Sequence, residues 1–191
     1  GPLWRAGRLT DPPLPFYGLQ GVDYVNGHGD GSYGHYLNWL KRGYPVEARL
    51  FLDRIPLQPP GPAFELFNRK SYKWALPAEL HPMSWIADRT IDFLRDQGER
   101  RRNGTAVSPF CLMCSIQEPH SPFAPPAPYC DAYDPADVPP PAGRPGEYDD
   151  LPPHYRAMYE EDITTSGNKG QAMRLTTPHR AECAAHYYGL I

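Results

Sequence analysis

The sequence has no hydrophobic run long enough to cross a membrane, because its longest apolar stretches are far too short to span a bilayer. It also has no basic and apolar leader at its start, so we expect nothing that directs secretion. No charge of one sign dominates, with 19 Lys and Arg against 22 Asp and Glu. The basic cluster at 99–104 is typical of a solvated loop, so neither a membrane nor a nucleic acid is expected as a partner.

Cysteine is scarce, with four in 191 residues. Cys111 and Cys114 form a Cys-x-x-Cys pair of the kind found in redox and zinc sites, but no second pair follows at zinc spacing. They lie in an apolar run of strand length, where side chains three positions apart face opposite sides. We interpret them as buried apolar thiols. This favours a reducing compartment and a cytoplasmic location, with a periplasmic or secreted location as the alternative.

The common nucleophile and phosphate-binding motifs are also missing. The sequence contains no Gly-x-Ser-x-Gly elbow and no Gly-x-x-x-x-Gly-Lys loop. Its acidic pairs, Asp149 with Asp150 and Glu160 with Glu161, lie in polar segments where adjacent carboxylates are usually solvated. The chain by itself therefore offers no credible nucleophile.

Proline is abundant instead, with 25 residues, and regular elements lie between the proline-rich stretches. A helix is predicted over 84–98, with Ser84 as its N-cap and Gly98 as the left-handed residue that closes it. A brief helix is predicted around 36–40, ended by a glycine and a proline. Another is predicted over 177–191, with Thr177 as its N-cap and Pro178 as its first residue. Its predicted buried stripe consists of Ala181, Ala184, Ala185 and Tyr188.

The run PFCLMCSIQ at 109–117 is nearly all apolar and has the length of a strand. Such a run predicts a strand covered on both faces, as in a parallel sheet flanked by helices. A shorter strand is predicted around 22–25. A helix followed by a loop and a buried strand indicates an α/β layer architecture. The proline-rich segment 119–153 that comes next is predicted to be a long ordered loop.

His120 lies between two prolines, just after this apolar run. In open parallel sheets, ligands bind beyond the carboxyl ends of the strands. Pro119 and Pro122 restrict the residues before them to extended conformations, so the imidazole is expected on a stiff backbone. Two interpretations stay open from the residues alone: a histidine that contacts an anion or transfers a proton, or one that only hydrogen-bonds the neighbouring loop.

The stretch NGHGDGSYGHYLNWL contains His28, Asp30 and His35. A His-x-Asp pair with a second histidine is compatible with a metal site. The glycines between them leave the geometry unconstrained, however, and no further ligand follows at regular spacing. A turn in which the His and Asp side chains cap neighbouring backbone groups is the favoured interpretation.

Three stretches together resemble the middle of the catalytic domain of type I sulfatases: WIADRTIDFLRD, SPFCLMCSIQEPHSPFAPPAPYCDAYDPADVPPP and HRAECAAHYYGLI. These are formylglycine-dependent hydrolases of the alkaline phosphatase superfamily. The stretch YGLQGVDYVNGHGDGSYGHYLNWL is similar to bacterial members that include phosphonate monoester hydrolases and choline-sulfatase-like proteins. The chain also begins without Met and ends inside a helical pattern, so we expect an internal piece of a longer protein.

The resemblance implies an α/β fold, part of an alkaline-phosphatase-like α/β/α sandwich with a mostly parallel sheet and long Pro-rich loops. It makes 1–191 a single partial domain, with 119–153 as an active-site loop. It also implies that His120, in the family's Pro-His-x-Pro motif, contacts the sulfate or phosphate of the substrate. The stretch GRLT resembles a second family motif, which makes Arg8 and Thr10 candidate substrate contacts, although the match departs from both known versions of that motif.

The remaining parts of the family's site are expected outside 1–191. None of the four cysteines stands in the family's Cys-x-Pro-x-Arg motif, and the metal-binding acidic residues of the family lie before and after this region. The intact enzyme would use formylglycine and a divalent cation, Ca²⁺ first and Mn²⁺ or Mg²⁺ as alternatives. This piece alone is therefore predicted to be inactive.

Three functions follow from these observations. The first is a sulfatase-type hydrolase of sulfate esters. The second is a phosphonate monoester hydrolase or phosphodiesterase of the same superfamily, which shares the same site. The third is a degenerate binding module without catalysis. In each case the partner is a small-molecule sulfate, phosphate or phosphonate ester, and a homo-oligomer is left open.

Overall fold

The computed structural model describes residues 1–53, 70–105, 108–140, 142, 146, 149–154 and 177–191. The chain divides into two compact units. The first holds the described residues of Gly1–Ile55 and Ala75–His120, and the second holds those of Pro56–Trp74 and Ser121–Ile191. The single partial domain expected over 1–191 stays a prediction. None of the helices in the described ranges combines the length and the apolar character that a membrane span requires.

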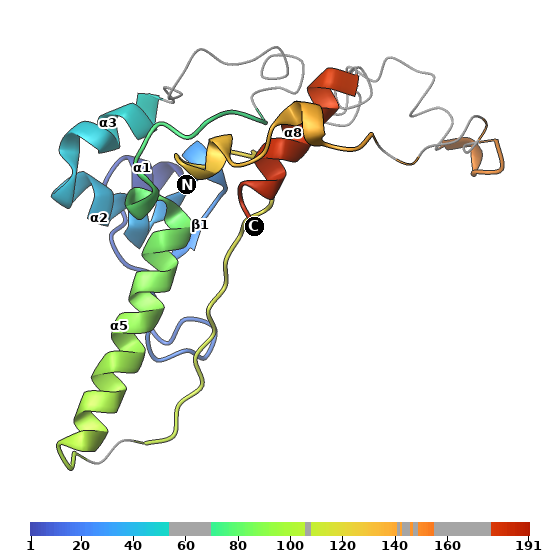
Figure 1. Cartoon of the computed structure of the whole chain (residues 1–191). Helices are drawn as coiled ribbons and strands as arrows, with labels where there is room; N and C mark the ends of the chain where they lie inside the picture. The colour runs from blue at the N-terminus through green and yellow to red at the C-terminus, as the bar shows by residue number, and fades with distance from the viewer. Residues whose placement is uncertain (54–69, 106–107, 141, 143–145, 147–148, 155–176) are drawn as a thin grey trace. The chain divides into compact units, whose positions relative to one another are not determined.

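The first unit is mainly helical (Figure 1). Two short strands pair antiparallel, with Val25 opposite Gly34, and the first of them begins at the last residue of the strand expected around 22–25. Its elements in chain order are α1 (Pro2–Arg5), β1 (Val25–Asn26), the 3₁₀ turn η1 (Gly29–Gly31), β2 (Tyr33–Gly34), α2 (His35–Gly43), α3 (Pro45–Asp53), the 3₁₀ turn η2 (Ala78–Leu80) and α5 (Pro82–Arg102).

The core of the first unit forms around α2, which ends at Gly43 as predicted. Tyr36 on this helix is completely buried, and its hydroxyl donates a hydrogen bond to the backbone oxygen of Leu80 at 2.8 Å. Its ring meets Phe51 of α3 and Trp85 of α5 edge to face, at centroid distances of 5.8 and 6.1 Å. Burial raises the pKa of the Tyr36 phenol, so the hydroxyl stays a hydrogen-bond donor.

The helix α5 begins two residues before its predicted start. His81 is the N-cap, and its Nδ1 accepts a hydrogen bond from the backbone N–H of Met83 at 3.3 Å. Pro82 occupies the first helical position, where a missing N–H costs nothing. Ser84, the predicted cap, lies inside the first turn and donates its hydroxyl to the backbone oxygen of Ala78 at 2.7 Å. The true cap was missed because imidazole is not a common N-cap group.

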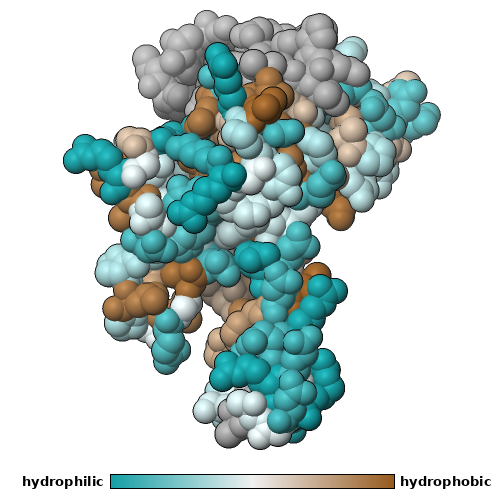
Figure 2. Space-filling model, turned by 90° about the vertical axis from the view of Figure 1, so that its left-hand side faces the viewer, coloured by the Kyte–Doolittle hydropathy of each residue, from teal (hydrophilic) through white to brown (hydrophobic). Residues whose placement is uncertain are grey.

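The other end of α5 lies beyond Gly98, so the predicted end was wrong. The backbone N–H of Gly104 bonds to the carbonyl of Arg101 at 3.2 Å, and that of Thr105 bonds to Arg100 at 2.9 Å. These two bonds form a Schellman motif, with Gly104 at φ +73° as its left-handed residue. A glycine does close the helix, but the glutamate and three arginines after Gly98 extend the helix first. This end of α5, lowest in Figures 1 and 2, is largely hydrophilic on the face shown.

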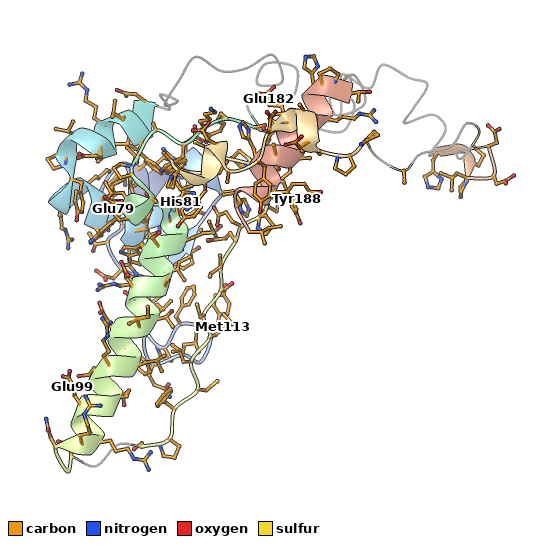
Figure 3. The ribbon with its side chains drawn as sticks, viewed as in Figure 1. Glu79, His81, Glu99, Met113, Glu182 and Tyr188 are labelled. Carbon is orange, nitrogen blue, oxygen red and sulfur yellow. The ribbon has the colours of Figure 1, made fainter. Side chains whose placement is uncertain are left out.

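Residues 108–116 differ most from expectation. The predicted buried strand is a segment without regular secondary structure, and its large side chains are exposed, with Met113 (Figure 3) 73% exposed. Phe110 packs edge to face against Phe93 of α5 at 5.1 Å. A strand needs a neighbour to pair its backbone groups. In the part of the chain that the structure describes, no strand or bridge pairs with this segment.

The second unit contains η3 (Tyr129–Asp131), η4 (Pro135–Asp137) and α8 (Thr177–Tyr188). Two segments far apart in the sequence run parallel in it and meet at a bridge between Ser71 and Phe123. Three backbone hydrogen bonds of 2.6 to 3.0 Å join these segments, from the N–H groups of Phe123, Tyr72 and Trp74 to the carbonyls of Lys70, Phe123 and Pro125 respectively. This pairing is short, and the α/β/α sandwich with its mostly parallel sheet stays a prediction.

The helix α8 confirms the helix predicted over 177–191, but it ends at Tyr188 and buries one narrow face. Ala185 is buried as predicted, whereas Tyr188 (Figure 3) is 38% exposed. The residues buried beside Ala185 are Cys183 and His186, which sequence reasoning had not assigned to the core. Tyr188 instead packs its ring against Tyr133 at 5.5 Å.

Candidate functional site

His120 ends a backbone turn of the first unit. Its N–H donates to the carbonyl of Gln117 at 3.2 Å, and the Gln117 side chain donates to the carbonyl of Val25 at 3.0 Å. The peptide bonds before Pro119 and Pro122 are both cis. The hydrogen bond within the turn and the one from the Gln117 side chain hold this backbone and tie it to β1. The imidazole of His120 is exposed.

The ring of His120 lies flat against the ring of His28, with centroids 3.7 Å apart and planes 13° from parallel. His28 precedes η1, and the glycines on either side of it, Gly27 and Gly29, have φ of +85° and +49°. A Cβ on Gly27 would lie 2.5 Å from the backbone oxygen of Gly31. Only glycine fits that position, so the turn that presents His28 depends on it.

Glu118 lies two residues before His120 in the chain. It is half-buried, and its Oε2 atom is shielded from solvent without a hydrogen-bond partner among the described residues. Burial raises the pKa of its carboxyl, while its own backbone N–H, the charge of His120 and the N–H of Gly29 act in the opposite direction. A partly buried carboxyl group beside an exposed histidine is typical of a functional site.

The structure separates the three residues considered for a metal. His28 faces His120, whereas Nδ1 of His35 accepts the backbone N–H of Tyr24 at 2.8 Å and its Nε2 lies 3.1 Å from Oδ1 of Asp11. Within the described ranges, no three His, Cys, Asp or Glu side chains are grouped to hold an ion. The described residues therefore do not bring His28, Asp30 and His35 together as a group of metal ligands. His35 supports a neighbouring backbone group, as the turn interpretation expected.

Arg8 and Thr10 lie in the segment that follows α1, and both are exposed. Thr10 accepts a long hydrogen bond of 3.4 Å at its carbonyl from the Asn38 side chain. Hydrogen bonds from Thr10 and His35 lower the pKa of the Asp11 carboxyl. These contacts tie Thr10 to α2, and the role of Arg8 and Thr10 in substrate binding stays a prediction.

Two further sequence predictions concern surface residues. Cys111 and Cys114 are exposed free thiols, so the prediction that they are buried was wrong, for the same reason that 108–116 is not a strand. Asp149 and Asp150 are exposed, in agreement with a solvated acidic pair. The pair at 160–161 lies outside the described residues.

The second unit holds a polar cluster that the sequence did not indicate. Oγ of Ser71 lies 2.8 Å from Nδ1 of His186, and the two residues are 1% and 6% exposed. Ser71 also hydrogen-bonds Cys183, whose thiol has a pKa raised by burial. Burial and the nearby charge of Lys73 lower the pKa of His186 to about 4. No spacing pattern joins residues 115 positions apart, so sequence reasoning could not find this contact.

A serine and a histidine at this distance have the geometry of a nucleophile and its base. Their burial argues against that role, because a substrate cannot reach either group. An ion pair between Lys73 and Asp131 lies at the edge of the same cluster, and Cys130 donates to Asp131 at 3.4 Å. We therefore assign this cluster to the core of the second unit.

Comparison with known proteins finds a local similarity. A stretch of 71 residues, 37% of this chain, is 41% identical to an arylsulfatase of Clostridium perfringens (strain 13 / Type A). That stretch spans 13% of the length of the arylsulfatase. No model of a protein family matches the chain. No solved structure matches it either.

Proposed function

We propose that this chain is part of a sulfatase-like hydrolase, in which His120 contacts the anionic group of a sulfate ester. The observation that carries the proposal is an exposed imidazole on a turn that hydrogen bonds tie to β1. The 41% identity to part of an arylsulfatase supports sulfate as the group that is bound. The pairing of His120 with a second imidazole and a half-buried carboxyl distinguishes it from an ordinary loop histidine.

The chemistry follows from the charge on the substrate. A sulfate ester carries a negative charge on its terminal oxygens, and this charge is redistributed as the S–O bond to the leaving group breaks. A protonated imidazole donates a charge-assisted hydrogen bond to such an oxygen, which is roughly twice as strong as a neutral one. The same group can instead protonate the leaving oxygen. Either role lowers the energy of the transition state.

The nucleophile and the metal are proposed to lie elsewhere in the protein. The sequence contains no Cys-x-Pro-x-Arg motif that would yield formylglycine. The described residues do not fit a divalent cation, because no three ligating side chains are grouped among them. Formylglycine and Ca²⁺, Mn²⁺ or Mg²⁺ therefore stay part of the proposal for the whole protein. The cytoplasmic location also stays a prediction.

A phosphate or phosphonate ester is the second candidate substrate. Its tetrahedral oxyanion presents the same hydrogen-bond acceptors to His120, so the geometry supports it nearly as well. A binding module without catalysis is the third candidate, favoured only by the lack of a nucleophile motif in this sequence. The experiment below separates all three.

The test measures hydrolysis of 4-nitrophenyl sulfate and of a phenylphosphonate monoester by the protein expressed from the complete reading frame. We expect turnover of the sulfate ester, and a loss of at least tenfold in His120→Ala, or about 1.4 kcal/mol of transition-state stabilisation. The control is His154→Ala, an exposed histidine of the second unit, which should keep full activity. The isolated 191-residue chain is expected to be inactive.

Each result has a defined consequence for the proposal. Unchanged turnover in a folded His120→Ala variant would exclude His120 from the site. A faster reaction with the phosphonate ester would make the second candidate the better one. Binding of sulfate without turnover of either ester would favour the module without catalysis.

A further inference from the structure

The side chain of His120 is contacted on its face by His28. We propose that His28 is a positioning residue for His120, because its ring fixes the plane of the imidazole. This inference rests on the proposed function, in which His120 is the substrate contact.

The contribution of His28 follows from the stacking geometry. Two rings 3.7 Å apart and 13° from parallel are in van der Waals contact over their whole faces. Turning the His120 ring about its side-chain bonds would break this contact or drive the ring into His28. Face contact leaves hydrogen bonding to the edges of the rings, because imidazole nitrogens bond in the ring plane. The stack thus sets the direction in which His120 can donate.

The turn that carries His28 is rigid enough for this role. Gly27 has φ of +85° and lies against the backbone of Gly31, so the loop before η1 is closely packed. His28 makes no side-chain hydrogen bond that caps η1. The ring of His28 lies against the ring of His120, with centroids 3.7 Å apart.

The test separates the flat ring of His28 from its nitrogens. We expect His28→Leu, which keeps apolar volume but not a flat ring, to lower kcat for 4-nitrophenyl sulfate about tenfold with a nearly unchanged melting temperature. His28→Phe keeps a flat ring and should restore most of the lost kcat. Full activity in His28→Leu would overturn the inference. Activity in His28→Phe as low as in His28→Leu would also overturn it, because the nitrogens rather than the ring plane would then matter.

Failure of this inference can be told apart from failure of the proposed function. His120→Ala, measured in the same assay, is the reference. A loss of activity in His120→Ala with none in His28→Leu would remove only the positioning role of His28. Full activity in His120→Ala would remove the proposed function itself.

Discussion

His120 in the first unit and His186 in the second both have a close side-chain partner, but solvent reaches only His120. The ring of His120 stacks on another imidazole and is exposed. His186 lies 2.8 Å from a serine hydroxyl, and both of these residues are buried. Judged by hydrogen-bond distance alone, the second cluster would be the better catalytic site. Accessibility reverses that order, because a buried pair can stabilise a core but cannot meet a substrate.

The largest effect that would sharpen this comparison is expected for His186→Ala. The change leaves the Ser71 hydroxyl without its buried partner and opens a cavity beside α8. We expect a loss of about 3 kcal/mol in the free energy of unfolding of the second unit. Hydrogen exchange of the α8 amides measures this loss. Exchange at the wild-type rate would show that the cluster does not stabilise the core.

Acid should weaken the same unit through His186. Burial, with the charge of Lys73, lowers its pKa to about 4 from the ordinary value of 6.5. The folded state therefore disfavours the protonated ring. The stability that the neutral ring of His186 contributes is complete above pH 6.5 and is lost as the pH falls toward 4. We expect the opening free energy of α8 to fall by up to about 3 kcal/mol across that window.

The matched control for the acid effect is His186→Gln. Its side chain does not titrate, so the opening free energy of α8 in this variant should be nearly independent of pH between 6.5 and 4. The carboxyl of Asp131 has a lowered pKa in the folded protein, so its protonation changes stability only below its ordinary pKa of 3.8. That range lies outside this pH window. If the opening free energy of α8 in the wild-type protein were equally independent of pH, the assignment of His186 to the buried core would be refuted.

Substitutions at two glycines of the first unit are expected to have smaller effects on stability and turnover. Gly27 and Gly18 both have left-handed φ, of +85° and +90°, but only Gly27 has backbone within contact distance of an added Cβ. Gly18→Ala should cost about 1 kcal/mol of stability and leave turnover unchanged. Gly27→Ala should cost more and also lower kcat about fivefold, because it displaces His28. Equal turnover in the two variants would mean that the His28 turn does not matter for the reaction.

The smallest effect is expected at Arg8, the substrate contact implied by resemblance. Exposed charge pairs contribute at most about 1 kcal/mol, so Arg8→Ala should raise KM about threefold and leave kcat unchanged. Arg8→Lys, which keeps the charge, should restore part of the affinity. A KM in Arg8→Ala equal to that of the wild-type protein would remove Arg8 from the site.

Local signals predicted the helices well. The apolar spacing around Tyr36 and Leu40 predicted α2, and the proline near the start of α8 predicted its N-terminal end. The ends of α5 were wrong because His81 is an unusual cap and because a second glycine, Gly104, lies just beyond Gly98. Helix ends depend on single residues, whereas helix existence depends on a pattern repeated over several turns.

The rest of the fold and site depends on contacts between distant residues. The strand predicted at 109–117 needs neighbouring strands, and a sequence pattern cannot supply those. Proline spacing singled out His120, but nothing in the sequence showed that His28, 92 residues earlier, would stack on it, or that Glu118 would be half-buried beside it. The Ser71–His186 contact is of the same kind. Such pairs form only when the chain folds back on itself.

The most direct measurement compares His120→Ala and His186→Ala in one assay of turnover per folded molecule, with melting temperatures recorded on the same samples. We expect His120→Ala to lose at least tenfold in turnover at an unchanged melting temperature. We expect His186→Ala to melt several degrees lower but to keep its turnover where it is folded. The opposite pattern, with turnover lost in His186→Ala and kept in His120→Ala, would contradict the account.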